Sequence, residues 1–474
     1  MLFNRTKVIA TIGPASSSEK TLEELLIAGV DVFRLNSSHG TYAEFSRVIS
    51  DIRKLNAKHT QNAAVLVDLL GPKIRVGEIE SGSIELEIGE QIILTTDDTA
   101  GTKERIHINY DRFPNDVKAG ENILIDDGKI QLTIIETDME KNVKAVVVNG
   151  GILLPRKGVN LPNTKVSLPS LTEKDFEDLN FALEQKVDWI GLSFVRTAED
   201  IRILKEIITK KGNFTKVIAK IEKPEAITDI DNIIRESDAV MVARGDLGVE
   251  MPMEEVPLIQ KMLVKKCLQA SRPVIIATQM LESMITNFSP TRAEVNDVAN
   301  SVIDGADAVM LSGETSVGKF PVKAVEYMQN IIATVEKKNY QYNRLHQPDP
   351  DSPTYISDSV CFSACVMASQ VGAKVIAGMT RSGYTAFRTT SQRPSASVII
   401  FTDNLPLLTV LSLVWGVRGF YYDRYVSTDE TISDIQKILK EKKILQENDI
   451  LVNIASIPLS ERGTANMVKL SRVK

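Results

Sequence analysis

The most constraining feature of the sequence is a strand-then-helix alternation that is interrupted once and then resumes. Three buried, Val- and Ile-rich stretches precede the interruption: Lys7–Ile12, Val30–Asn36 and Ala64–Leu70. Five more follow it: Val187–Phe194, Val217–Glu222, Asp238–Arg244, Pro273–Thr278 and Asp307–Gly313. Eight βα units favour an α/β fold built on a (β/α)8 TIM barrel, and an open doubly wound sheet is the alternative.

The interruption has a different pattern. From about Val76 to Leu168, short alternating strands are separated by turn sequences such as Asp126-Asp127-Gly128. No good helix interrupts them, so we expect an all-β domain inserted after strand 3. A Pro- and Asp-rich link from Gln347 to Asp351 leads into a further α/β segment. The predicted domains are residues 1–71 and 169–345 for the barrel, 72–168 for the insert, and 346–474 for a C-terminal α/β domain.

Charge and composition argue against several classes of protein. The 474 residues carry a formal net charge of −6, which is unfavourable for a dominant role in binding nucleic acid. No apolar run is long enough to span a membrane, and the first residues do not form a secretion signal. The three cysteines, Cys267, Cys361 and Cys365, do not make a disulfide framework. We expect a cytoplasmic protein with no membrane and no nucleic-acid partner.

Functional side chains gather at the carboxyl ends of the predicted strands. Lys220 and Glu222 are two residues apart, so on a strand both point to the same face. In a (β/α)8 barrel the carboxyl ends of all strands meet at one mouth, where active sites lie. The polar and glycine residues expected there are Arg34, Asn36, Ser38, Asp68, Ser193, Lys220, Glu222, Arg244, Gly245, Asp246, Thr278, Gln279, Ser312 and Glu314.

These residue types point to metal-assisted chemistry on an anion. Glu222 and Asp246 come from adjacent strands and can share a hard divalent cation, Mg²⁺ or its substitute Mn²⁺. Arg34 and Lys220 bring positive charge to the same mouth, which suits a transferring phosphoryl group or an enolate. We find no nucleophile elbow for acyl transfer, no Walker A sequence and no dinucleotide fingerprint in the barrel.

Six runs of sequence, in order along the chain, resemble the pyruvate kinase family. They are Thr6–Ser16, Arg34–Gly40, Lys220–Glu225, Ala243–Glu250, Ala277–Ser283 and Met310–Thr315. The resemblance covers nearly the whole chain. It implies transfer of phosphate from phosphoenolpyruvate to ADP in glycolysis, giving pyruvate and ATP. It also implies Mg²⁺ as cofactor, a homotetramer, and an insert that acts as a β-barrel lid over the nucleotide.

The resemblance assigns roles to residues already singled out. Lys220 would stabilise the transition state at the phosphoryl group, and Arg34 would hold the phosphate. Glu222 and Asp246 would bind Mg²⁺, while Gly245, Asp246 and Thr278 would seat the substrate carboxylate. A water relay through Thr278, Ser312 and Glu314 is the candidate proton source for the enolate. The nucleotide-binding positions would be Pro14, Arg34, Asn36, His39, Arg75 and Lys157.

One stretch departs from the commonest family pattern. Many members need K⁺ and carry Thr-Lys followed by Gly-Pro-Glu-Ile-Arg, but here Leu69-Leu70 and then Lys73 stand at those positions. This resembles the K⁺-independent branch, because a tethered ammonium can supply the charge of K⁺. We expect a vestigial monovalent-cation site served by Lys73 and made by Asn36, Ser38, Asp68 and the Leu69 carbonyl. The alternative is that Lys73 is only a solvated residue of the lid.

The C-terminal segment holds a second candidate site. Thr380, Ser382, Gly383 and Thr385 lie between a predicted strand and a predicted helix, where backbone N–H groups can bind a phosphate. In the family such positions border a pocket for a sugar-phosphate effector, and this assigns the domain a regulatory role. The alternative is an ordinary strand–helix turn. Competing functions are an aldolase acting on pyruvate through a Mg²⁺-enolate, and a silent ligand-sensing relative.

Overall fold

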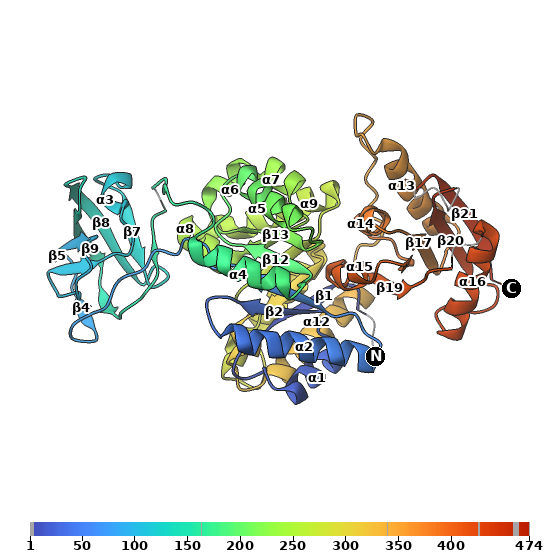
Figure 1. The fold of residues 1–474 in the computed structure, drawn as a ribbon, viewed down its shortest axis with the longest axis horizontal. Helices are drawn as coiled ribbons and strands as arrows, with labels where there is room; N and C mark the ends of the chain where they lie inside the picture. The colour runs from blue at the N-terminus through green and yellow to red at the C-terminus, as the bar shows by residue number, and fades with distance from the viewer. Residues whose placement is uncertain (1–3, 163, 339, 425–426, 458–463, 474) are drawn as a thin grey trace.

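Three parts of the chain lie in a row, with the barrel between the other two (Figure 1). The computed structural model describes residues 4–162, 164–338, 340–424, 427–457 and 464–473. The insert lies at one end of the barrel and the C-terminal α/β part at the other. Among the helices so described, none is long and apolar enough to cross a membrane.

The central part is a closed barrel of eight parallel strands, which confirms the barrel and excludes the open sheet. The neighbours follow the order β1-β16-β15-β14-β13-β12-β3-β2. Most of the strand residues are buried, because helices cover the outside and side chains fill the inside. The strands are β1 (Lys7–Thr11), β2 (Val32–Asn36), β3 (Ala64–Asp68), β12 (Trp189–Leu192), β13 (Lys216–Ile221), β14 (Ala239–Ala243), β15 (Val274–Ala277) and β16 (Ala308–Leu311).

Helices surround the barrel, and four of those that the structure describes begin with capping boxes. Thr41 with Glu44 opens α2, Thr172 with Asp175 opens α4, Thr197 with Asp200 opens α5 and Thr291 with Glu294 opens α10. The helices of this part are α1 (Glu19–Ala28), α2 (Tyr42–His59), α4 (Glu173–Glu184), α5 (Ala198–Lys210), α6 (Pro224–Thr228), α7 (Ile230–Glu236), α8 (Arg244–Glu250), α9 (Val256–Ala270), α10 (Arg292–Asp304), α11 (Gly313–Ser316), α12 (Pro321–Lys338), η1 (Met253–Glu255) and η2 (Glu282–Ile285).

The insert is built from short strands, as expected, around its own apolar core. Its sheets differ from the expected β-barrel: they are a six-stranded sheet in the order β11-β7-β8-β9-β5-β6 and a separate pair, β10-β4. One short helix, α3 (Phe113–Asp116), also interrupts the strands, and its Phe113 is buried in the core. The strands are β4 (Ile84–Leu86), β5 (Gln91–Thr95), β6 (Arg105–His107), β7 (Asn122–Ile125), β8 (Ile130–Thr137), β9 (Asn142–Asn149), β10 (Gly151–Leu153) and β11 (Val159–Asn160).

The C-terminal part is a five-stranded sheet in the order β19-β18-β17-β20-β21. Four of these strands are parallel to one another, and β21 pairs antiparallel with β20 at the edge of the sheet. The elements are α13 (Tyr355–Gln370), β17 (Val375–Met379), α14 (Tyr384–Ser391), β18 (Ser397–Thr402), α15 (Leu405–Val410), η3 (Leu411–Leu413), β19 (Val417–Tyr421), α16 (Thr428–Glu441), β20 (Ile450–Ala455) and β21 (Met467–Arg472).

Candidate active site

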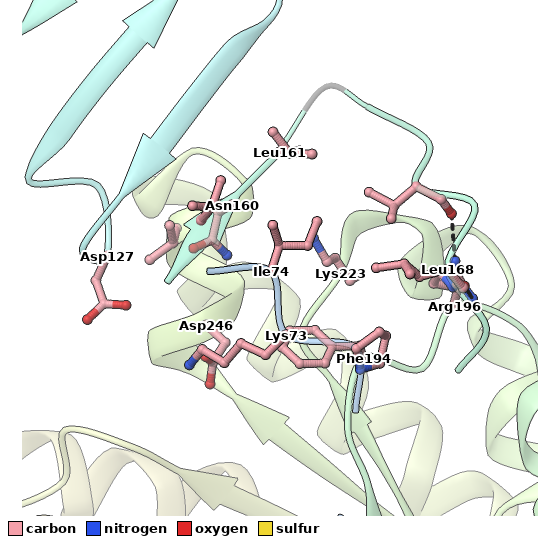
Figure 2. A pocket seen from close by; sticks show the side chains of 14 residues that line it. Lys73, Ile74, Asp127, Asn160, Leu161, Leu168, Phe194, Arg196, Lys223 and Asp246 are labelled. Carbon is pink, nitrogen blue, oxygen red and sulfur yellow. Dashed lines mark hydrogen bonds between the residues drawn. The ribbon is translucent and has the colours of Figure 1, made fainter. Parts of the chain in front are cut away.

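A pocket lies where the barrel mouth meets the insert (Figure 2). The barrel contributes Asp246 from α8 and Lys223 from the turn between β13 and α6, and the insert contributes Asp127 and Asn160. Lys73, on the segment that enters the insert, points toward Asp246 in this view. The pocket therefore places residues of both parts beside the carboxyl ends of the barrel strands.

Beside this pocket, the barrel mouth holds a buried cluster of charges. Arg34 donates hydrogen bonds from Nε and Nη2 to Oδ2 of Asp68, at 2.8 and 2.5 Å. Lys220 Nζ lies 3.3 Å from the same Asp68 oxygen and 2.8 Å from Oε1 of Glu222. It also donates to the Ser193 hydroxyl at 2.8 Å. Strands β2, β3, β12 and β13 thus bring the predicted residues together as one network.

The pKa shifts of this cluster follow from its pairing. Burial by itself would lower the pKa of Lys220, but the neighbouring Asp68 and Glu222 carboxylates raise it. Burial by itself would raise the pKa of Asp68, but Arg34 and Lys220 hold it below the usual value. An ammonium and a carboxylate that are both stabilised in their charged forms keep the anion-binding charge fixed at neutral pH.

Gly191, which is not among the predicted site residues, leaves space for the Asp68 side chain. A Cβ at Gly191 would overlap Oδ1 of Asp68, a buried atom for which the described residues provide no hydrogen-bond partner. Of the eight barrel strands, only β12 contains a glycine. A glycine within a strand often marks a close approach, so this was a usable signal.

The donor set of Glu222 and Asp246 fits a hard divalent cation. Glu222 is 2% exposed, and burial together with the negative charge of Asp246 raises its pKa, while Lys220 opposes the shift. A bound cation would relieve the repulsion between these two carboxylates. Within the described ranges no cluster offers three or more His, Cys, Asp or Glu ligands. Water and substrate oxygens would therefore complete the coordination, as Mg²⁺ commonly requires.

Phe194 holds Glu222 from an unusual backbone conformation. Its φ of 53° lies in the left-handed region, which is uncommon for a bulky residue. In this conformation its backbone N–H donates to Oε2 of Glu222 at 2.9 Å. Residues with a strained backbone concentrate at functional sites, but no sequence pattern predicts the conformation of Phe194.

Thr278 and Gly245, for which the same role is predicted, are joined by a hydrogen bond. The Gly245 N–H donates to Oγ1 of Thr278 at 2.7 Å. Thr278 is β-branched and has a φ of 67°, a costly conformation that its surroundings must impose. Arg244 supplies this constraint by donating a hydrogen bond to the Thr278 carbonyl at 2.8 Å. The Arg244 guanidinium also donates to both carboxylate oxygens of Asp297, each at 2.6 Å.

Among the described residues, the expected proton relay is connected only in part: Ser312 and Glu314 share one hydrogen bond, through the Ser312 backbone N–H, and Thr278 is bonded to neither. Glu314 accepts from the N–H of Leu281 at 3.0 Å and the N–H of Ser312 at 2.7 Å. It is 2% exposed, and burial raises its pKa. In the described part of the chain, no hydrogen bond joins Thr278 to Ser312 or the Ser312 hydroxyl to Glu314.

The predicted nucleotide residues lie in two groups. Pro14 and His39 are exposed at the barrel mouth, near Arg34 and Asn36 in the chain. On the insert, Arg75 pairs with Gly158 in a β-bridge and donates to the Arg156 carbonyl at 3.0 Å. Lys157 forms an ion pair of 2.8 Å with Asp126. No hydrogen bond or ion pair connects the two groups within the residues that the structure covers.

The expected vestigial cation site is only partly assembled. The Asn36 side chain accepts from the Ser38 N–H at 3.2 Å, and the Leu69 carbonyl accepts from the Ser193 hydroxyl at 2.7 Å. Lys73 instead lines the pocket beside Asp246, with its Cε near Gly158. Over the described residues, it makes no hydrogen bond or ion pair with these groups or with Asp68.

The candidate effector residues form the turn between β17 and α14. The Gly383 N–H donates to Oγ1 of Thr380 at 3.0 Å, and the Tyr384 N–H donates to Oγ of Ser382 at 3.3 Å. Thr385 is buried in the first turn of the helix.

Comparison with known proteins gives one consistent result. The family model "Pyruvate kinase, barrel domain" matches residues 3–325, and "Pyruvate kinase, alpha/beta domain" matches residues 358–471. A pyruvate kinase of Geobacillus stearothermophilus is 41% identical over 468 residues, which are 98% of this chain and 80% of that protein. One from Staphylococcus aureus (strain MRSA252) is 40% identical over 472 residues, 99% of this chain and 81% of its own.

A solved structure agrees with these matches. A pyruvate kinase from Cryptosporidium parvum superposes with a TM-score of 0.93 at 35% identity, covering 99% of this chain and 96% of the other. The likeness extends over the barrel, the insert and the C-terminal part together, because nearly all of both chains is covered. With the buried Lys220 cluster and the paired carboxylates at the barrel mouth, the chain belongs to the pyruvate kinase family of phosphotransferases.

Proposed function

We propose that this enzyme transfers the phosphoryl group of phosphoenolpyruvate to ADP, giving pyruvate and ATP in glycolysis. The observation that carries the proposal is the position of Lys220, whose ammonium lies 2.8 Å from Glu222 beside the second carboxylate, Asp246. A fixed cation next to a metal-binding pair is what a migrating phosphoryl group needs. An aldolase would need no nucleotide-covering insert, and a silent relative would not need to keep Lys220, Glu222 and Asp246.

Each residue of the cluster then has a defined task. Lys220 and Arg34 place positive charge against the phosphoryl oxygens as charge develops on them. Glu222 and Asp246 would hold Mg²⁺, which would act as a Lewis acid toward the oxygens of the substrate. The Gly245 and Asp246 backbone and the Thr278 hydroxyl would seat the substrate carboxylate at the end of β15.

Protonation of the enolate carbon completes the reaction. Thr278, Ser312 and Glu314 are the proposed source, with water bridging the gaps that direct hydrogen bonds leave. The raised pKa of Glu314 favours its protonated form, which suits a group that must deliver a proton. Arg75 and Lys157 on the insert would meet Pro14, Asn36 and His39 across the nucleotide when the lid closes.

We further propose that the enzyme works without K⁺ and that Lys73 supplies the missing charge. Lys73 lies on the segment that enters the insert and lines the pocket beside Asp246. Closure of the lid would carry its ammonium toward Asp68, whose buried Oδ1 accepts no hydrogen bond from any residue that the structure describes. That oxygen is a ready acceptor for a tethered ammonium.

A pyruvate-release assay with phosphoenolpyruvate, ADP and Mg²⁺ tests both proposals, run once with K⁺ and once with a bulky organic cation. Equal activity supports both. Activity with K⁺ alone keeps the transferase and rejects the role of Lys73. No activity from folded protein in either cation, with candidate sugar phosphates added, rejects the transferase. Lys73→Glu should convert the enzyme to K⁺ dependence, and Lys73→Met is the control that removes charge without reversing it.

We also predict an effector, an assembly state and a cellular compartment for this enzyme. A sugar phosphate would bind the turn of Thr380, Ser382, Gly383 and Thr385, whose hydroxyls and N–H groups already bond one another. The enzyme would assemble as a homotetramer through barrel and C-terminal contacts. It would work in the cytoplasm, in keeping with its three unpaired cysteines.

A further inference from the structure

One buried ion pair ties together the two segments that carry the carboxylates Glu222 and Asp246. Lys223 directly follows Glu222, and Glu250 closes α8, the helix that carries Asp246 in its first turn. Lys223 Nζ lies 2.5 Å from Oε1 of Glu250, and the two side chains are 15% and 2% exposed. A charge pair so far removed from water needs good geometry, and loss of either partner is costly.

The insert contributes a third member to this pair. Asn160, on β11, donates from Nδ2 to the same Oε1 of Glu250 at 2.7 Å. Asn160 and Lys223 line the same pocket as Asp246 (Figure 2). The other oxygen of Glu250, Oε2, is buried without a hydrogen-bond partner among the described residues. Glu250 is therefore held by a residue of the metal-binding segment and by one of the insert.

The strand that bears Asn160 is also linked to a predicted nucleotide residue. Lys157 lies three residues before Asn160, and both follow the insert's return toward the barrel. β11 pairs with β7 through Val159 and Asn160, which makes this short stretch part of the insert's main sheet. A change in the position of Glu250 would be transmitted to this sheet through one hydrogen bond.

We propose that Glu250 is a positioning residue that couples the Mg²⁺ site to the lid. Through Lys223 it fixes the spacing of the segments that bear Glu222 and Asp246, and through Asn160 it anchors β11. The inference rests on the proposed function, since it takes Glu222 and Asp246 as the metal carboxylates. Groups that orient metal ligands in this way typically affect metal affinity about 10- to 100-fold.

Two measurements on the full chain test the coupling without relying on turnover. The first is the Kd for Mn²⁺, measured without nucleotide from the free-ion EPR signal. Glu250→Gln and Lys223→Met should each weaken Mn²⁺ binding about 10-fold, whereas Asn160→Ala should leave it unchanged. The second is amide hydrogen exchange in residues 157–162. Mn²⁺ should slow this exchange in the wild type but not in Asn160→Ala.

The outcomes separate the inference from the proposed function. Glu222→Gln is the control for the metal site, and unchanged Mn²⁺ affinity in that variant would reject Glu222 as a ligand. If Glu222→Gln abolishes binding but Glu250→Gln and Lys223→Met bind normally, the positioning role is rejected. If Asn160→Ala keeps the Mn²⁺-dependent protection, the link to the lid is rejected. Thermal melts establish which variants are folded. If Glu250→Gln does not fold, the Mn²⁺ affinity of Lys223→Met decides whether the positioning role holds.

Discussion

Three side chains contact the Lys220 ammonium and hold it in place. Asp68 and Glu222 supply charge, and Ser193 supplies a hydrogen-bond acceptor. Lys220→Met keeps much of the side-chain volume and removes the charge. We expect kcat to fall at least about 10²- to 10³-fold, the usual effect of losing one transition-state electrostatic contact.

The matched control is Lys205→Met, because Lys205 pairs with Asp238 at 3.1 Å ahead of β14, at the opposite end of the barrel. This variant should keep near-normal kcat. A loss of only a few-fold in Lys220→Met, with the fold intact by circular dichroism, would remove Lys220 from the proposed role.

Gly191 offers a second test at the scale of one residue. In Gly191→Ala the new methyl group would overlap Asp68 Oδ1, so the carboxylate must move away from Arg34 and Lys220. Overpacking of this kind costs typically about 1–3 kcal/mol. We expect a lower Tm and a loss of turnover in the protein that remains folded, measured by calorimetry and initial rates.

Gly378→Ala is the control for a glycine in a parallel strand. A Cβ at Gly378 of β17 would meet only side-chain atoms, at 3.0 Å from Ile400 and 3.4 Å from Thr385. It should change Tm without changing turnover. If Gly191→Ala behaves in the same way, the position of Asp68 does not limit the reaction.

At the scale of elements, one carboxylate joins both connections between the barrel and the insert. Asp175, in the first turn of α4, accepts from the Gly71 N–H at 3.0 Å through Oδ1. Its other oxygen accepts from the N–H and hydroxyl of Thr172, at 2.8 and 2.6 Å. Gly71 leads into the insert and Thr172 follows it, so Asp175 fixes the two ends of the hinge together.

Asp175→Ala should loosen this hinge. It leaves the Gly71 and Thr172 donors unsatisfied, at a cost of about 1–3 kcal/mol for each group that stays buried. We expect faster amide exchange at Gly71 and Thr172, measured by hydrogen-exchange mass spectrometry, and a higher KM for ADP.

Glu294→Ala is the matched control, since Glu294 also completes a capping box and accepts from a distant backbone N–H, that of Ser283, at 2.7 Å. It should destabilise α10 but leave exchange at Gly71 unchanged. Equal exchange at Gly71 in Asp175→Ala and wild type would show that Asp175 caps α4 without controlling the hinge.

The same elements show how far a sequence can be interpreted. Barrel strands such as β1 are buried along their whole length, so a nearly continuous apolar run in the sequence predicts them. β21 is harder to predict, because its residues are partly or largely exposed and its sequence, Met-Val-Lys-Leu-Ser-Arg, does not alternate regularly between apolar and polar residues. The strand-end residues could be predicted because barrel topology alone brings them to one mouth.

Other features of the site depend on contacts between distant segments. The Asn160–Glu250 hydrogen bond spans 90 positions, and its formation requires the insert to be placed against α8. The left-handed backbone of Phe194 is imposed by its surroundings, so residue preferences argue against it. Lys73 was expected beside Asp68 but lies in the pocket beside Asp246, because the insert's position determines where this segment lies.

At the scale of the whole molecule, Asp188 links the barrel to the C-terminal part. It lies just before β12, accepts from the Val65 N–H at 2.7 Å, and accepts from the hydroxyl of Thr409 on α15. Burial raises the pKa of Asp188 to about 6, although Thr409, Val65 and Arg53 each act to lower it. The contact between the two parts therefore includes a carboxyl group that titrates near neutral pH.

The sign of the effect on stability follows from this pKa. The folded protein holds the Asp188 proton more tightly than the unfolded chain, where the pKa has its ordinary value of 3.8. The protonated Asp188 carboxyl therefore stabilises the folded protein fully below about pH 4, and this stabilisation is lost as the pH rises through about 6. Its size is at most about 3 kcal/mol, from about 1.4 kcal/mol per pKa unit.

Asp188→Asn should remove this dependence, because the amide does not ionise. The Tm of the variant relative to wild type should rise as the pH increases from about 5 to about 8, since only the wild type acquires a partly buried negative charge at this position. Thr409→Val removes a hydrogen bond that favours the ionised form, so its Tm should fall more steeply than that of wild type over the same range. Parallel Tm curves for all three proteins would mean that Asp188 stays ionised throughout and that the interface does not respond to pH.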